Sequence, residues 1–249
     1  PILAVGGAKY VKTDDLEIRD TTININTVKE LSNNIRANQG SLKICYQNLS
    51  LSIWNELPGS LIEVEEIAQN IMGVDLLTGS NACESKIKHL SQSGKLLEYE
   101  VIHFATHGVV VPEIPELSAL VLSQFDEDVD GEDGYLTIGE IEELNLSADF
   151  VNLSACNTGL GKVFASEGVI GLTQSFLIAG ANSVSVSLWP VDDKSTSIFM
   201  VELYKLAESE GLSYSEAMSE VKRKFINGDF GEQYRAPYYW APFVFYGVD

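Results

Sequence analysis

The chain has 249 residues, 45% of them hydrophobic, and a formal net charge of −20 from 36 acidic against 16 basic side chains. This length suits one sizeable α/β domain with a single buried core, and no apolar run is long enough to span a bilayer. An acidic balance this strong repels phosphate backbones and anionic lipids, so nucleic acid and membranes are not expected as direct partners, whereas a basic substrate segment would be attracted.

The cysteine content indicates a reducing compartment. The three cysteines form no C-x-x-C pair and, together with the three histidines, match no closed zinc-ligand spacing. We therefore expect a cytoplasmic protein without a metal or cofactor. The sequence opens on Pro1 rather than Met, which favours a fragment of a longer protein.

The first 56 residues combine one strand with a polar segment. Residues 1–8 predict a strand that ends in a Gly-Gly turn, because no phosphate-binding glycine motif is present. Residues 9–56 are polar and Asn-rich, with a helix expected over 27–38 and a strand over 42–49. We expect mainly solvated loop here, the alternatives being packing on the sheet or contact with a partner.

From residue 58 the pattern becomes regular. Apolar residues at helical spacing predict a helix, with Ser60 and Glu63 as its capping box. A strand over 74–78 and a helix capped by Asn81 follow. The continuous apolar run 98–105 is typical of a buried parallel strand. His103 inside this run is expected to be packed and hydrogen-bonded.

The next stretch contains an acidic loop. A strand over 118–123 precedes it, and a short helix capped by Thr137 follows. The loop partly matches a calcium loop that starts at Asp126, since Gly131 fits position 6. Thr137, however, occupies position 12, where a glutamate is required, so no calcium site is expected.

Two apolar runs stop at residues with catalytic chemistry. The run 98–105 leads to His107, and the run from residue 149 leads to Cys156, 49 positions later. Neighbouring parallel strands would bring both to one carboxyl edge, where open α/β sheets bind ligands. An imidazole can take the proton of a thiol to give a nucleophilic thiolate. We predict Cys156 as nucleophile, His107 as base and acid, and the N–H groups of Gly108 and Cys156 as an oxyanion hole.

The last quarter carries candidate specificity residues. A helix ending at Gly180 and a strand over 182–189 precede Asp192 and Asp193. These carboxylates could line a pocket for Lys or Arg, or one could cap the helix that begins near residue 194. Trp189 is either a pocket wall or core packing. Helices over 195–210 and 213–226 lead to a final strand over 238–246, which Pro242 places at an edge.

The alternation of strands and helices predicts a mainly parallel sheet of about six strands with helices on both faces. Five stretches closely resemble the CHAT domain, a caspase-like module of bacteria often attached to tetratricopeptide repeats: HFATHG (103–108), DGYLTIGEI (133–141), NLSACNTGLG (152–161), EGVIGLTQSFLIAGANSVSVSLWPVDD (167–193) and YYWAPFVFYG (238–247). The resemblance covers residues 57–247, with residues 1–56 variable, within a single domain over 1–249. Asn157 stands where many relatives have an acidic residue.

The resemblance implies a caspase-like three-layer sandwich, a dyad of Cys156 and His107, and kinship with caspases, separases and gingipains. In separase a similar segment carries an Asp that reads arginine, which points to Asp192 or Asp193. We expect a cysteine endopeptidase that cuts a protein substrate under control of a tetratricopeptide-repeat or other sensor domain, and that cuts after a basic residue if Asp192 or Asp193 lines the pocket. The alternatives are a catalytically silent scaffold and a cysteine acyltransferase or small-molecule hydrolase.

Overall fold

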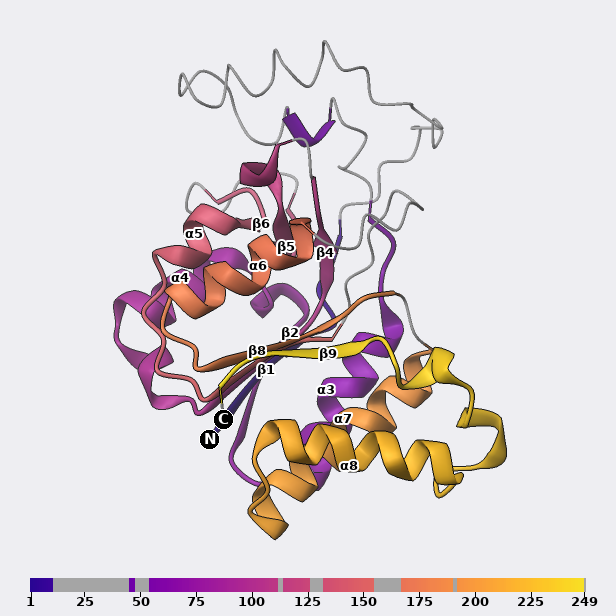
Figure 1. Ribbon diagram of the computed structural model, residues 1–249. Coiled ribbons are helices and arrows are strands. Elements are labelled where there is room, and N and C mark those ends of the chain that lie inside the picture. Colours follow the sequence, from indigo (N-terminus) through magenta and orange to yellow (C-terminus); the bar gives the residue numbers. More distant parts are fainter. Residues whose placement is uncertain are drawn as a thin grey trace.

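A six-stranded sheet forms the centre of the molecule (Figure 1). The computed structural model describes residues 1–10, 45–47, 54–111, 114–125, 132–154, 167–189 and 192–248. In sheet order the strands are β2 (Val74–Thr78), β1 (Ile2–Gly6), β3 (Val101–Ala105), β7 (Phe150–Leu153), β8 (Ser183–Ser187) and β9 (Phe243–Gly247). All pair in parallel except β9, which is antiparallel at one edge. The predicted mainly parallel sheet is confirmed.

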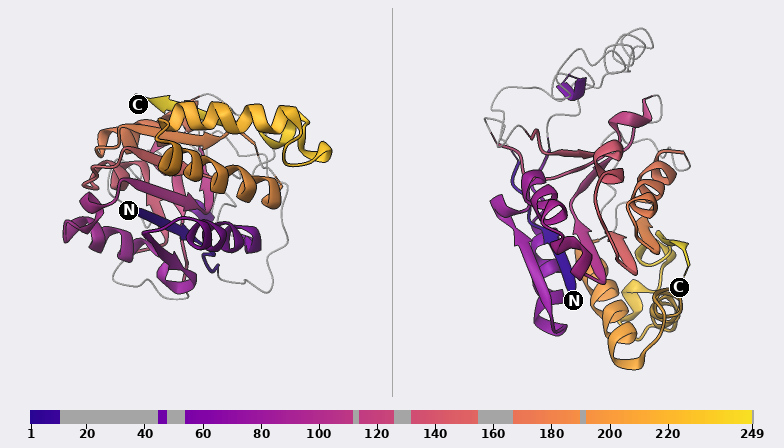
Figure 2. Two further views of the ribbon diagram at one scale, coloured as in Figure 1. Left: turned by 90° about the horizontal axis from the view of Figure 1, so that it is seen from below. Right: turned by 90° about the vertical axis from the view of Figure 1, so that its left-hand side faces the viewer.

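Helices cover both faces of this sheet. One face carries α3 (Pro58–Asn70), α7 (Asp193–Glu210) and α8 (Tyr214–Asn227), and the other carries α4 (Glu84–Gln92), α5 (Ile138–Glu142) and α6 (Glu167–Ile178). Single-turn helices join these elements at η1 (Gly79–Asn81), η2 (Lys95–Glu98), η3 (Pro115–Leu117), η4 (Glu232–Tyr234) and η5 (Pro237–Tyr239). The termini, which overlap in Figure 1, are separate in Figure 2. The three-layer α/β sandwich is therefore confirmed.

Strand alternation divides the core into two halves, because successive side chains point to opposite faces. Val101 and Phe150 face α7 and α8, and Phe150 stacks on Tyr214 with ring centroids 4.6 Å apart. Phe104, on the other face, packs against Phe176 of α6 at 5.6 Å. Burial of both faces explains the unbroken apolar runs in the sequence.

A second, antiparallel sheet stands above the first. Its order is β4 (His107–Val109), β5 (Ala119–Val121) and β6 (Tyr135–Thr137). The strand expected over 118–123 belongs to this sheet. His107 is consequently the first residue of β4, two positions after β3 ends.

Two helix starts, those of α3 and α4, differ from the sequence prediction. Helix α3 begins at Pro58, a residue favoured at the first helical position. Ser60 therefore caps nothing; its Oγ accepts the N–H of Gly7 at 3.0 Å. Cys83, rather than Asn81, precedes α4. The capping box of Thr137 at α5 is confirmed.

Part of the polar N-terminal segment is packed: Tyr10, Cys45, Tyr46 and Trp54 are buried, whereas Lys9, Gln47, Asn55 and Glu56 are exposed. Residues 45–47 are helical, so the strand predicted over 42–49 is wrong there, while the helix predicted over 27–38 lies outside the described residues. Tyr46 is buried and stacks on Tyr135 with centroids 3.7 Å apart. Its hydroxyl donates to the carbonyl of Leu117 at 2.9 Å. The packing alternative, not solvated loop, holds for Cys45 and Tyr46.

A membrane-spanning helix, which would have to be both long and apolar, is not found among the described residues.

Candidate active site

The strands β3 and β7 lie side by side and point in the same direction. Phe104 pairs with Leu153 in the parallel register, and the N–H of Ser154 donates to the carbonyl of Phe104 at 2.9 Å. The predicted adjacency of the two strands is thus confirmed. Cys156 itself lies outside the described residues, which stop at Ser154 and resume at residue 167.

His107 is a buried imidazole with one bonded ring nitrogen. Its Nε2 lies 2.7 Å from the backbone carbonyl oxygen of Asn55. A carbonyl oxygen only accepts hydrogen bonds, so this contact assigns the proton to Nε2. Nδ1 is left as the basic nitrogen, and it has no hydrogen-bond partner among the described residues.

The surroundings of His107 keep its ring neutral. Burial lowers its pKa below the ordinary value of 6.5, and the hydrogen bond to Asn55 offsets only part of that effect. Two aromatic rings, Tyr10 and Trp54, each lie with their centroids 5.1 Å from that of the imidazole. A neutral imidazole with a free Nδ1 can accept the proton of a thiol.

Sequence reasoning missed Tyr10, Trp54 and Asn55. Tyr10 and Trp54 adjoin the two ends of the part of the N-terminal segment that is largely outside the described residues. The indole N–H of Trp54 donates to the hydroxyl of Tyr135 at 3.1 Å, which fixes the ring beside His107. The available signal was the presence of isolated aromatic residues in a polar stretch. The contact of Asn55 is made by its backbone and has no sequence signal.

Gly108 lies next to His107 within β4, where it is buried and pairs with Leu120 of β5. Its predicted role in an oxyanion hole involves Cys156 and remains a prediction.

The three predicted specificity residues follow β8 but occupy different positions. Asp192 is the N-cap of α7, its Oδ1 accepting the N–H of Ser195 at 3.0 Å. The capping alternative is therefore confirmed for Asp192. The side chain of Asp193 packs on Gly59 at the start of α3, so closely that a Cβ there would lie 2.0 Å from its Cγ. Burial, and next the charges of Asp192 and Glu63, raise the pKa of Asp193.

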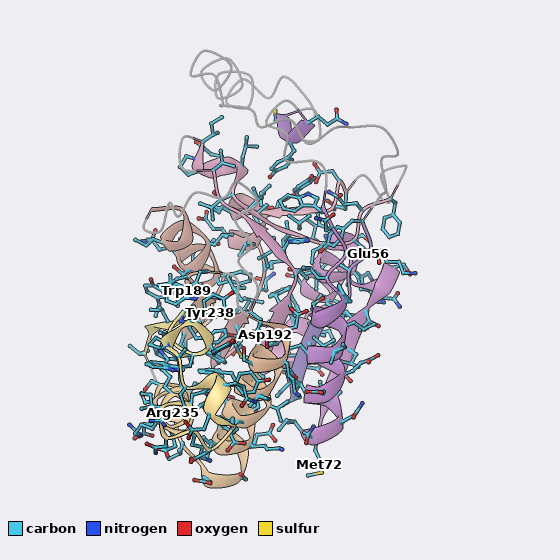
Figure 3. The ribbon with its side chains drawn as sticks, turned by 90° about the vertical axis from the view of Figure 1, so that its right-hand side faces the viewer. Glu56, Met72, Trp189, Asp192, Arg235 and Tyr238 are labelled. Atoms are coloured by element: carbon cyan, nitrogen blue, oxygen red, sulfur yellow. The ribbon has the colours of Figure 1, made fainter. Side chains whose placement is uncertain are left out.

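Trp189 lies at the surface of the same region. Its indole N–H donates to the backbone carbonyl of Tyr238 at 3.1 Å, and Figure 3 shows these two residues next to each other, with Asp192 nearby. Trp189 is half-buried, which disfavours the core-packing alternative.

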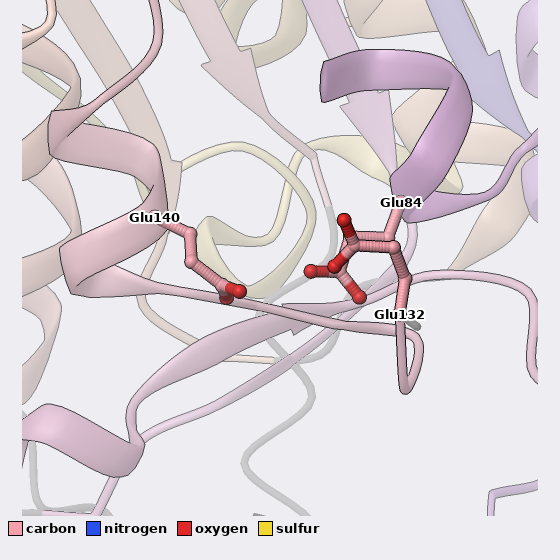
Figure 4. A group of neighbouring side chains, drawn as sticks. All are labelled: Glu84, Glu132 and Glu140. Carbon is pink, nitrogen blue, oxygen red and sulfur yellow. The ribbon is translucent and has the colours of Figure 1, made fainter. Parts of the chain in front are cut away.

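A further group of carboxylates includes none of the predicted site residues. The carboxylates of Glu84, Glu132 and Glu140 come within 4.8 Å of one another (Figure 4). The ammonium of Lys88 bonds all three, at 2.8 Å from both Glu84 and Glu140. The cluster is thus held together by a cation of the chain itself. Most of the acidic loop considered for calcium lies outside the described residues.

Comparison with known proteins assigns this chain to a family. The family model of the CHAT domain matches residues 5–248. Tetratricopeptide repeat protein 28 of Homo sapiens is 28% identical over 226 residues, and that of Mus musculus 26% identical over 231. Each alignment covers 79% of this chain but only 9% of the relative, so the chain spans about a tenth of these curated relatives. Both relatives are mammalian, and a bacterial source stays a prediction. The chain belongs to the CHAT domain family, which is related to caspase-like peptidases.

Proposed function

We propose that this chain is a cysteine endopeptidase in which His107 activates the thiol of Cys156. The observation that carries the proposal is the state of His107. Its Nε2 is held by the Asn55 carbonyl, and its basic Nδ1 is buried without a partner among the described residues. A buried imidazole nitrogen with no partner is uncommon, because buried polar atoms are normally satisfied.

The position of the strands supports a thiol as the missing partner. Cys156 comes two residues after Ser154, a separation that spans at most about 7 Å. Ser154 is bonded to Phe104, and Phe104 is followed three positions later by His107. The two strands that precede the candidate residues therefore end side by side at the same edge of the sheet.

The proposed reaction has two halves, acylation of Cys156 and hydrolysis of the resulting thioester, and His107 transfers protons in both. Nδ1 of His107 takes the thiol proton, and the thiolate attacks the peptide carbonyl carbon. The carbonyl electrons move to oxygen, which the N–H groups of Gly108 and Cys156 would stabilise. The C–N bond then breaks as His107 returns the proton to the leaving amine. Water, deprotonated by His107, hydrolyses the thioester and releases the thiol.

Asp193 is the stronger candidate for recognition of a basic substrate residue. The Asp192 carboxylate is already used to cap α7, whereas that of Asp193 lies between the starts of α3 and α7. The net charge of −20 would favour the approach of a basic segment. We further propose that repeats like those for which the relatives are named control the peptidase in the full-length protein.

The test is cleavage of a mixed peptide library, with cut sites read by mass spectrometry. Wild type should cut, and Cys156→Ala and His107→Ala should not. Asp193→Asn should reduce cleavage after Lys and Arg by about tenfold or more. Asp192→Asn is the matched control, because Asn also caps helices and should leave the cuts unchanged.

Cuts by the Cys156→Ala variant would refute the dyad. Cuts that need Cys156 but follow other residues would refute only the role of Asp193. Absence of cutting by wild type, even after addition of a tetratricopeptide-repeat partner domain, would favour the silent scaffold.

A further inference from the structure

A cluster of buried polar side chains lies next to the edge of the sheet at which β3 and β7 end. His103 of β3 and Asn152 of β7 point to the α3 and α7 face of the sheet, and so does Ser154. All three side chains are buried, and Glu63 of α3 is buried with them. None of these groups can contact a substrate, so the proposed reaction does not use them directly.

Glu63 connects the two strands that lead to the dyad. Its Oε1 accepts the hydroxyl proton of Ser154 and lies 3.1 Å from Nε2 of His103. The latter approach is poorly aligned for a hydrogen bond, so we treat it as an electrostatic contact. Burial of a carboxyl group is costly unless it has such partners.

Two hydrogen-bonding groups on the side of His103 opposite Glu63 fix the orientation of its ring. Its Nδ1 lies 2.8 Å from the hydroxyl of Tyr204 on α7 and 3.1 Å from Nδ2 of Asn152. The same Nδ2 donates to the sulfur of Met200 at 3.3 Å, which assigns the amide nitrogen to this side. Nδ1 therefore accepts, and Nε2 carries a proton toward Glu63.

The bond to Ser154 acts where β7 ends. The N–H of Ser154 still bonds to β3, and Cys156 follows two positions later. Helix α3 is itself fixed to the end of β1, because Ser60 Oγ accepts the N–H of Gly7. The side chain of Glu63 thus joins helix α3 to Ser154, the last described residue before the candidate nucleophile.

We propose that Glu63 is a positioning residue for Cys156, acting through Ser154. This inference rests on the proposed function, because it assumes that Cys156 reacts. Glu63 holds the side chain of Ser154 at the end of β7, and we expect this bond to keep the thiol two positions later within reach of His107. Misplacement of a reacting group by about 1 Å can cost on the order of 100-fold in rate.

The test measures the reactivity of Cys156 without requiring a known substrate. The purified chain is alkylated with iodoacetamide across a pH series, and the modified peptides are quantified by mass spectrometry. Cys83, which is half-buried on another element, serves as the internal reference. Thermal melting is recorded for each variant. Ser183→Ala is the matched control, because Ser183 is also buried and donates to a single carbonyl, at the opposite end of the sheet.

We expect Ser154→Ala to slow alkylation of Cys156 at neutral pH by about tenfold and to raise its apparent pKa toward about 8.5, the value of a free thiol. Cys83 and the Ser183→Ala variant should be unchanged. Glu63→Gln keeps an acceptor oxygen for the hydroxyl of Ser154, so its alkylation rate should stay within about twofold of wild type. Glu63→Leu removes this acceptor and should resemble Ser154→Ala.

A fall in melting temperature for Ser154→Ala with an unchanged pH profile of Cys156 would overturn the proposal and leave a purely structural role. His107→Ala separates this failure from that of the proposed function. If His107→Ala also leaves the profile of Cys156 unchanged, the dyad itself is refuted. If only His107→Ala changes the profile, the dyad stands and the role of Glu63 falls.

Discussion

Isosteric substitutions in the carboxylate cluster around Lys88 should change stability in opposite directions. Burial, and next the charge of Glu140, raise the pKa of Glu84 from 4.5 to about 9. The contribution of protonated Glu84 to the free energy of unfolding is therefore fully present below pH 4.5 and is lost as the pH rises through about 9. Hydrogen bonds from Lys88 and Thr137 outweigh burial at Glu140 and lower its pKa. The contribution of Glu140 is present above pH 4.5 and is lost as the pH falls.

The size of the effect on the free energy of unfolding follows from the pKa of Glu84. Holding Glu84 protonated at pH 7 costs about 3 kcal/mol relative to an unfolded chain with a pKa of 4.5, at about 1.4 kcal/mol per pH unit. Glu84→Gln mimics the protonated group, and its loss of bonding to Lys88 offsets part of the gain. We expect the free energy of unfolding at pH 7 to rise by about 1 to 3 kcal/mol, which is roughly 2 to 6 °C in melting temperature for a chain of this size.

The assay is thermal unfolding followed by circular dichroism at pH 5, 7 and 8. Glu140→Gln is the control within the same cluster and should lower the free energy of unfolding at pH 7 by about 1 to 2 kcal/mol. The gain from Glu84→Gln should shrink toward zero near pH 5. A melting temperature lowered by Glu84→Gln at pH 8, to the same extent as by Glu140→Gln, would refute this reasoning.

Two further substitutions, each with a control variant, test the steric limit at a glycine and the shielding of His107 from water. Gly180→Ala should cost at least about 2 kcal/mol of stability, because φ is +113° and the added Cβ would lie 2.3 Å from the carbonyl oxygen of Leu146. Gly94→Ala, with φ of +76° and open space, should cost only about 1 kcal/mol; equal losses in chemical denaturation would contradict the steric argument. Trp54→Ala should hydrate His107 and raise its pKa toward 6.5, which moves the acid limb of kcat/KM to higher pH. Trp54→Phe should not shift this limb, and an unmoved limb in Trp54→Ala would show that the indole does not shield the base.

The main sheet could be predicted from the sequence because its strands are buried on both faces. The runs ending near Ala105 and Leu153 are continuous and apolar, and each precedes a polar or small residue. Helix caps were less predictable. Asp192 and Thr137 cap as expected, but the hydroxyl of Ser60 accepts a hydrogen bond from Gly7, which follows β1 and is far away in the sequence.

The environment of His107 could not be predicted for a related reason. Its bonded partner is a backbone carbonyl 52 positions away, and any residue type supplies the same group. The contact depends on the path of the N-terminal segment, whose polar composition gave no periodicity to follow. The inward turn of Glu63 was equally hidden, because its spacing from Ser60 also fits a solvent-exposed capping box.

The most direct test of the central claim is a crystal structure of the chain with Cys156 trapped by a peptide electrophile. We expect a covalent bond from the electrophile to Sγ of Cys156, with Nδ1 of His107 as its nearest ring nitrogen, within about 4 Å. Nε2 should remain on the Asn55 carbonyl. A trapped Cys156 that lies beyond reach of His107, or that faces Nε2, would contradict the proposed dyad.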